Sequence, residues 1–296
     1  MRPLKLAVWV ALITSLWIDA VAAAPLEPEM VEIKSGSYPI GSDDGPRSAS
    51  PLHRVTLETF LIDAYEVTNA QFATFLNTLG IKPKRSVPAG ELRSADVEGP
   101  DAERVWGGRG GNDRAFIELD DTDARIGIVD GVFVPEPGYA DHPVSESTWQ
   151  GTMAFCTWRG ARLPSEAEWE AAARGQEGRT YPWGEDPPTR EHAVFGSGRG
   201  ETDPVGSHPK GATPEGVFDL SGNEAEWTSS LLKTYPYNAN DGREDPNAPG
   251  ERVTRGGDHV FDVDPDQLTG HFRDGYSRDP RRGHRHIGFR CAKDTK

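Results

Sequence analysis

The sequence has few cysteines, no long apolar run after its N-terminal segment, and fewer basic than acidic residues. Cys156 and Cys291 are the two cysteines among 296 residues, and they do not form a C-x-x-C motif, which disfavours free thiols as nucleophiles or metal ligands. After residue 18 no segment is long and apolar enough for a membrane span, which needs about 20 residues. The 32 basic residues face 47 acidic ones, for a formal net charge of -15. This balance disfavours binding to nucleic acid or to an anionic membrane surface.

The N-terminus has the pattern of a secretory signal peptide. Arg2 and Lys5 precede an apolar run at 6–18, and residues 20–22 form an A-x-A cleavage site. This order of basic, apolar and small residues predicts a signal peptide at 1–22. An uncleaved anchor is the alternative, although the apolar run is short for one. We therefore expect an exported protein, located in the periplasm or outside the cell.

Export changes what the two cysteines can do. In an oxidising compartment Cys156 and Cys291 can pair, and two thiols without a third partner suggest one disulfide. Closing so long a loop stabilises a fold by about 4–5 kcal/mol in the chain-entropy model.

Glycine and proline are abundant, with 33 and 24 residues, and they favour a loop-rich fold because they end regular elements. The 8 tryptophans and 11 phenylalanines supply enough apolar surface for a core. Thr68 with Gln71, and Ser165 with Glu168, have the spacing of helix capping boxes. The sequence predicts extended segments at 30–42 and 55–62, helices at 68–80, 149–159 and 165–175, and a long surface excursion at 81–130.

Several longer motifs follow one another along the chain. They are MVEIKSGSYPIGS (30–42), FLIDAYEVTNAQFATFLN (60–77), HPVSESTWQGTMAFCTWRGARLPSEAEWEAAARG (142–175), DLSGNEAEW (219–227), RVTRGG (252–257) and IGFRCAKD (287–294). Together they resemble the formylglycine-generating-enzyme (sulfatase-modifying factor) domain over residues 27–296. The resemblance implies an α+β, elaborated C-type-lectin-like fold with little regular secondary structure and a variable insertion at about 81–130. It also places Cys156 and Cys291 at positions that are disulfide-bonded in the family's best-known enzyme.

The resemblance implies a calcium site in DLSGNEAEW. Asp219 and Glu226 match side-chain ligands, and Gly222 and Glu224 match positions that contribute backbone carbonyls. Two carboxylates and two carbonyl oxygens suit a hard cation completed by water. A hydrogen-bonded turn without an ion is the alternative. A second calcium site of the family is not expected, because Val194 stands where its asparagine ligand belongs.

The catalytic cysteines of the family are missing. In the family two thiols that follow the Arg-Gly-Gly motif bind copper and oxidise a substrate cysteine with oxygen. Here Phe261 and Asp266 occupy those positions, and no cysteine lies between residues 156 and 291. Neither side chain supplies the thiolate that a cuprous ion prefers. Formylglycine generation by the known mechanism is therefore not expected.

Acidic and imidazole side chains surround the two replaced positions, at His259, Asp262, Asp264, Asp266 and His271. Imidazole with carboxylate suits iron or manganese, so a metal or acid–base site is one interpretation. Asp266 and His271 are its first candidates. A solvated acidic loop is the other interpretation. The nearby basic run at 273–286 could bind an acidic ligand through its arginines, or pair with the chain's own carboxylates.

Two functions are compatible with this sequence. The first is an exported, oxidoreductase-like maturation factor with a site that differs from the copper–cysteine one. The second is a catalytically silent member of the family that binds a protein or a small ligand through its lectin-like surface. The family's oxidative chemistry favours the first. Calcium is the expected structural cofactor, and the sequence names neither a redox metal nor a particular partner.

Overall fold

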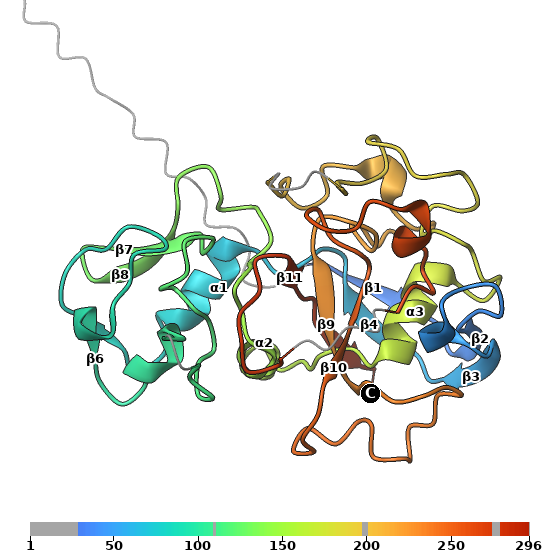
Figure 1. The fold of residues 1–296 in the computed structure, drawn as a ribbon, viewed down its shortest axis with the longest axis horizontal. Helices are drawn as coiled ribbons and strands as arrows, with labels where there is room; N and C mark the ends of the chain where they lie inside the picture. Colours follow the sequence, from blue (N-terminus) through green and yellow to red (C-terminus); the bar gives the residue numbers. More distant parts are fainter. Residues whose placement is uncertain (1–28, 109–110, 197–200, 274–278, 296) are drawn as a thin grey trace, which may run out of the picture.

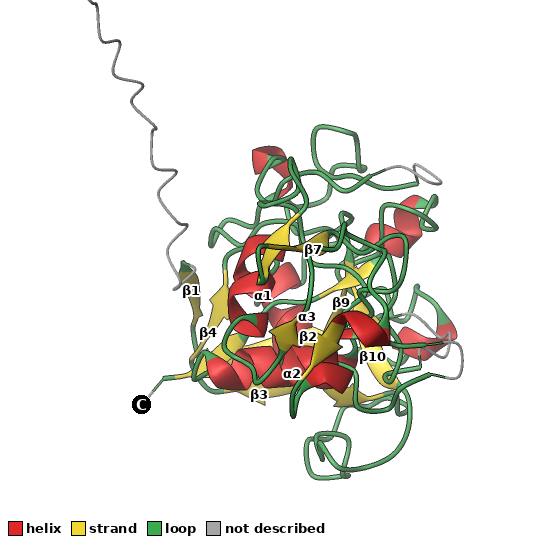
Figure 2. Cartoon of the chain, turned by 90° about the vertical axis from the view of Figure 1, so that its left-hand side faces the viewer, coloured by secondary structure: helices red, strands yellow, loops and turns green. Residues whose placement is uncertain are grey.

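The computed structural model describes residues 29–108, 111–196, 201–273 and 279–295. The predicted signal peptide at 1–22 lies outside these ranges. Helices and strands are short and are separated by long loops (Figure 2), as the glycine and proline content predicts. Within the described ranges, no helix has the length and apolar character needed to cross a membrane.

Two three-stranded sheets organise the larger part of the molecule, on the right in Figure 1. In the first, the central strand β4 pairs antiparallel with β1 and β12, so the two ends of the described chain lie in one sheet. In the second, β9 pairs antiparallel with β10 and parallel with β11. The bounds are β1 Met30–Ile33, β4 Phe60–Asp63, β12 Ala292–Asp294, β9 Ala225–Leu231, β10 Arg252–Arg255 and β11 Ile287–Gly288. A two-stranded sheet of β2 (Gly36–Ile40) and β3 (His53–Leu57) lies beside them.

The three predicted helices are present. They are α1 Asn69–Leu76, α2 Trp149–Trp158 and α3 Glu166–Arg174. Both predicted capping boxes form, from Thr68 and Gln71 before α1 and from Ser165 and Glu168 before α3. These boxes satisfy backbone N–H groups that the first helical turn leaves without partners. Helix α3 packs against β2, β9 and β10.

The segment 81–130 is not the surface excursion that its composition suggested. It contains β5 (Lys82–Pro83), β6 (Val97–Glu98) and β7 (Ile126–Val129), and β7 pairs with β8 (Val132–Pro135). Its apolar side chains join one buried core with α1 and α2, and the segment forms the left-hand part of Figure 1. The prediction was wrong because these apolar residues are scattered among glycines and charges, without a helical or strand period. They include Val87, Leu92, Val97, Val105, Ile117, Leu119, Ile126 and Ile128.

One disulfide links α2 to the residue just before β12. The sulfur atoms of Cys156 and Cys291 are 1.99 Å apart, and 135 residues separate the two cysteines. Both side chains are fully buried in the core that α1, α2 and the 81–130 segment share. The disulfide therefore uses every cysteine of the chain.

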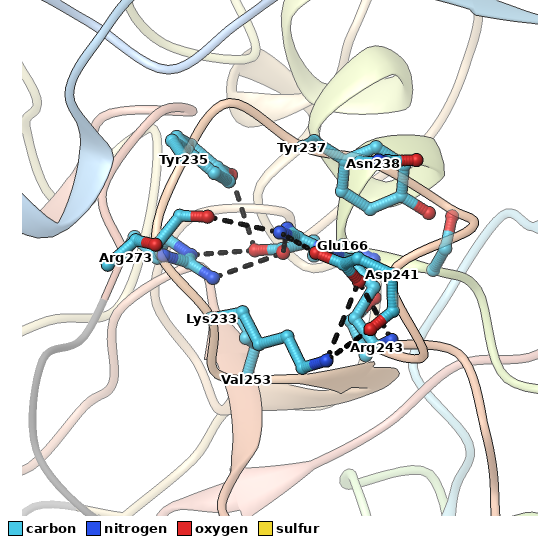
Figure 3. A network of polar contacts seen from close by, with 12 residues as sticks. Glu166, Lys233, Tyr235, Tyr237, Asn238, Asp241, Arg243, Val253 and Arg273 are labelled. Atoms are coloured by element: carbon cyan, nitrogen blue, oxygen red, sulfur yellow. Dashed lines mark hydrogen bonds and ion pairs between the residues drawn. The ribbon is translucent and has the colours of Figure 1, made fainter.

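Glu166, in the first turn of α3, is the centre of a buried network of charges (Figure 3). Its Oε1 accepts hydrogen bonds from Arg243 Nη1 at 2.9 Å and from Arg273 Nη2 at 3.1 Å. Its Oε2 accepts from Arg273 Nε at 2.7 Å and from the Tyr235 hydroxyl at 3.2 Å. Two loops that are distant in sequence are thereby fixed to one helix.

We predict that replacing Glu166 by Ala lowers the free energy of unfolding by about 3–5 kcal/mol, because two buried guanidinium groups lose a partner. Urea titration followed by circular dichroism measures this change. Glu136→Ala is the control, since Glu136 forms a half-exposed ion pair with Arg125 at 3.3 Å and such pairs contribute about 0–1 kcal/mol. Equal losses in the two variants would contradict the prediction.

Candidate functional site

The DLSGNEAEW segment forms a tight turn that leads into β9. Asp219 and Gly222 both have positive φ, at 54° and 77°. A Cβ atom on Gly222 would lie 2.2 Å from the carbonyl oxygen of Val194, so this position requires glycine. The same Val194 carbonyl accepts a hydrogen bond from Asn223 N at 2.8 Å. Val194 therefore contacts the turn through its backbone.

The two predicted carboxylate ligands of this turn have different surroundings. Glu226 is bound by Arg290, whose Nε and Nη2 lie 2.6–2.9 Å from its two oxygens. Trp169 Nε1 donates a third hydrogen bond to Glu226 Oε2 at 2.9 Å. Asp219 accepts a hydrogen bond from Gly206 N at 2.6 Å. The charge of Glu226 is thus balanced by a guanidinium, whereas burial raises the pKa of Asp219.

Glu66, which sequence reasoning missed, is a further buried carboxylate at this turn. Its oxygens accept hydrogen bonds from Asn223 Nδ2 at 2.7 Å and from Glu224 N at 3.0 Å. Burial, and next the charges of Asp219 and Glu226, raise its pKa well above the ordinary value. Asp219 and Glu66 are the carboxylates that could offer charge to a cation here, and calcium at DLSGNEAEW stays a prediction.

The two positions that the resemblance matches to the family's thiols, Phe261 and Asp266, lie on the surface. Phe261 is 53% exposed, and its ring meets the edge of the His286 ring at 4.8 Å between centroids. Asp266 is exposed in the 3-10 helix Pro265–Leu268. Asp266 also lines a cavity of about 780 Å³ together with His271, so the structure brings the two predicted catalytic candidates to one cavity.

His271 is a neutral imidazole in this cavity. Burial, and next the positive charge of Arg174, lower its pKa to about 4, while Asp266 acts in the opposite direction. Its Nδ1 is buried without a hydrogen-bond partner among the described residues. Asp43, Asp44, Arg174 and Tyr181 are among the other residues of the wall. Neither Asp266 nor His271 belongs to a preformed metal-ligand group in the described part of the chain.

A second cavity, of about 220 Å³, lies next to the first replaced position. Its lining comes from the 81–130 segment, the segment before α2, residues 201–202, the turn before β9, the loop after the Arg-Gly-Gly motif and Arg285. The lining residues include Asp123, Arg125, Tyr139, Glu224, His259 and Arg285. Glu224 is 1% exposed, and neither oxygen of its carboxylate has a hydrogen-bond partner among the described residues. Burial, and next the charge of Glu146, raise its pKa well above the ordinary value.

Asp121, Asp123 and Glu146 form an acidic group beside this second cavity. One oxygen from each side chain lies within 4.8 Å of the others, so the group could hold a metal ion. Burial, and next the charge of Asp121, raise the pKa of Glu146 to about 9. Sequence reasoning missed this group because its members belong to segments that only folding brings together. The acidic run ELDDTD at 118–123 was the one available signal.

The described arginines of the basic run pair with carboxylates of this chain, which confirms the second of the two interpretations for them. Arg282 contacts Glu118 at 3.0 Å, and Arg285 lies 3.8 Å from Asp123. Arg273 binds Glu166 (Figure 3). Residues 274–278 of the run lie outside the described ranges.

Comparison with known proteins agrees with this architecture. The model of the sulfatase-modifying factor enzyme 1-like domain matches residues 19–295. The formylglycine-generating enzyme of Streptomyces coelicolor is 32% identical over 290 residues, which cover 90% of this chain and 89% of that enzyme. The serine/threonine-protein kinase Pkn1 of Chlamydia trachomatis is 34% identical over 286 residues. That match covers 94% of this chain, but the chain spans only 40% of the kinase's length.

The structure of PvdO from Pseudomonas aeruginosa resembles this one with a TM-score of 0.59 and 25% identity, and the match covers 92% of this chain and 97% of PvdO. The fold is therefore of the formylglycine-generating-enzyme type, with the lectin-like, loop-rich α+β architecture expected from the sequence. The chain belongs to the sulfatase-modifying factor enzyme 1-like family. It is a member with no cysteine between residues 156 and 291, where the resemblance places the catalytic thiols.

We predict that the His271 ring titrates near pH 4 in the folded protein, as measured by NMR of the histidine side chains. The unfolded chain binds this proton with a pKa of about 6.5. The stability that comes from the neutral ring is therefore present above pH 6.5 or so and is lost as the pH falls toward 4.

Two variants check this assignment. His271→Gln identifies the resonance, and Asp266→Asn lowers the pKa further because it removes a charge that favours the protonated ring. Asp264→Asn, at an exposed position of the same loop, is the control and leaves the titration in place. A His271 pKa between 6 and 7 would contradict the assigned environment.

Proposed function

We propose that this chain is an exported maturation factor of the oxidoreductase type, acting on a protein or small-molecule partner without copper held by cysteines. Membership of the family supports oxidative chemistry with molecular oxygen as the electron acceptor. The disulfide supports a departure from the thiol mechanism, because it uses both cysteines of the chain. The signal-peptide pattern at 1–22 supports a periplasmic or extracellular location.

The cavity shared by Asp266 and His271 is the observation that carries this proposal. Asp266 stands at the position of the second family thiol, and His271 offers a neutral ring with a buried Nδ1 that has no hydrogen-bond partner among the described residues. A neutral imidazole can accept a proton or bind a transition metal, and a carboxylate complements either role. The volume, about 780 Å³, is in the range of small-molecule sites.

Ligand binding without turnover is the second candidate function. Phe261 and Val263 are 53% and 61% exposed, so apolar side chains stand on the surface at and beside the first replaced position. Such residues suit contact with a partner rather than redox chemistry. In the described part of the chain, the ligand atoms of Asp266 and His271 also do not converge into a metal-ready group.

Metal content distinguishes the two candidates. We predict that the mature protein, dialysed without chelators, retains iron, manganese or copper in a 1:1 ratio, as measured by inductively coupled plasma mass spectrometry. His271→Ala removes this metal and abolishes oxygen consumption in the presence of a substrate. His208→Ala is the control, because His208 pairs with Asp203 outside the cavity at 2.9 Å.

Calcium as the sole bound metal, with no oxygen consumption by the wild-type protein, would contradict the oxidoreductase proposal and support the binding function. A redox metal retained by both His271→Ala and Asp266→Ala would place the chemistry elsewhere in the molecule.

A further inference from the structure

Three carboxylates from two separate segments meet beside the smaller cavity. Asp121 and Asp123 belong to the inserted segment, and Glu146 precedes α2. One oxygen of each lies within 4.8 Å of the other two. Calcium binds oxygen at about 2.3–2.6 Å, so ligands on opposite sides of the ion are about 4.6–5.2 Å apart. The group therefore has the dimensions of a calcium site.

The backbone of Glu146 is held firmly in place. It has a φ of 58°, in a region that few residues other than glycine adopt. Its N–H donates to the carbonyl of His284 at 3.1 Å, and its carbonyl accepts from Glu118 N at 3.0 Å. A Cβ atom on Gly283 would lie 2.3 Å from the Glu146 carbonyl oxygen. Glycine at 283 thus permits this close approach, which fixes the direction of the Glu146 side chain.

The carboxylate of Glu146 is buried among like charges. Glu146 is 3% exposed, and the charges of Asp121, Glu118 and Asp123 act on it together with its burial. The nearby Arg282 offsets part of this effect, but it is also bound by Glu118. Burying a carboxylate beside other carboxylates is costly, and a bound cation would reduce that cost.

Glu224 is an independent observation that points to a ligand at the same place. Its side chain is almost fully buried, neither oxygen has a hydrogen-bond partner among the described residues, and it lines the cavity together with Asp123. Among the neighbouring charges, that of Glu146 raises the pKa of Glu224 most. Arg285, 3.8 Å from Asp123, and Arg125 line the same cavity.

We propose that Asp121, Asp123 and Glu146 bind a calcium ion, that Glu224 faces this ion as a fourth carboxylate, and that the ion fastens the inserted segment to the rest of the domain. This site is separate from the predicted one at DLSGNEAEW. The main chain of Glu224 turns toward Glu66 there, whereas its side chain lines the cavity on the Asp123 side.

Calcium fits this group better than magnesium. Magnesium requires oxygen ligands at about 2.0–2.1 Å in near-octahedral geometry, so opposite ligands are about 4.2 Å apart. The ligand oxygens here lie within 4.8 Å of one another, which the longer bonds and flexible geometry of calcium accommodate. Calcium also accepts bidentate carboxylates and six to eight oxygens, so three carboxylates with water can complete its coordination.

Calorimetric titration of the chelator-treated full-length protein with calcium chloride tests the proposal. We expect the wild-type protein to bind calcium at this site and its Tm to rise with calcium more than with magnesium. Glu224→Gln weakens binding about 10–100-fold, as the loss of an outer carboxylate does, and Glu146→Gln weakens it more. Asp219→Asn removes charge from the DLSGNEAEW turn and leaves this binding event unchanged.

Asp130→Asn is the matched control, because Asp130 is an exposed carboxylate with positive φ at the β7–β8 turn of the same segment. Circular dichroism establishes that each variant is folded. If Glu146→Gln fails to fold, the partly exposed Asp123→Asn replaces it in the titration.

Wild-type affinity retained in Glu146→Gln or Asp123→Asn would overturn the assignment. Loss of all calcium binding in Asp219→Asn would also overturn it. The same holds if the wild-type protein gives no calorimetric signal with calcium up to about 10 mM, a concentration above the range of weak extracellular calcium modules.

Discussion

The buried guanidinium of Arg290 is the interaction on which the rest of this structure depends. It binds both oxygens of Glu226 on β9 and donates to the carbonyls of Asp63, Ala64 and Phe218. The next residue, Cys291, closes the disulfide. One side chain thus connects the two sheets and the turn before β9. Short strands supply few backbone hydrogen bonds, so buried ion pairs of this kind fix the relative positions of the loops, and removing either partner is costly.

The same interaction shapes the charge distribution of the candidate sites. Arg290 balances the negative charge of Glu226. The carboxyl groups of Glu66, Asp219 and Glu224 are also buried nearby. Asp266 lines one cavity together with His271, and Val260, the neighbour of Phe261, lines the other together with Glu224. The scaffold of the family is therefore retained, and carboxylates and imidazoles, rather than thiols, line the two cavities. Hard or borderline metal ions and proton transfer suit these groups, whereas cuprous ion does not.

Much of the fold could be predicted from local sequence signals. The helices follow from capping boxes and glycine stops, which act within a single turn, and the chain contains just one possible cysteine pair. The segment 81–130 could not be predicted in this way, because Val87 and Ile128 become core residues only through contacts with α1 and α2. In the candidate site, Asp266 and His271 could be proposed from the sequence because they follow a recognisable motif. Glu66 and Glu146 were missed because isolated glutamates carry no signal of burial.

The sequence by itself determined the family, the helices, the cysteine pair and the loss of the catalytic thiols, because each depends on residue identity and short-range spacing. The tertiary structure decided which carboxylates are neutralised and which are left to face a cavity. Glu226 and Glu224 are two residues apart, yet one is bound by Arg290 and the other has no partner among the described residues. The difference follows from burial and from contact with Arg290, which is distant in sequence. Neither can be inferred from neighbouring residues in the chain.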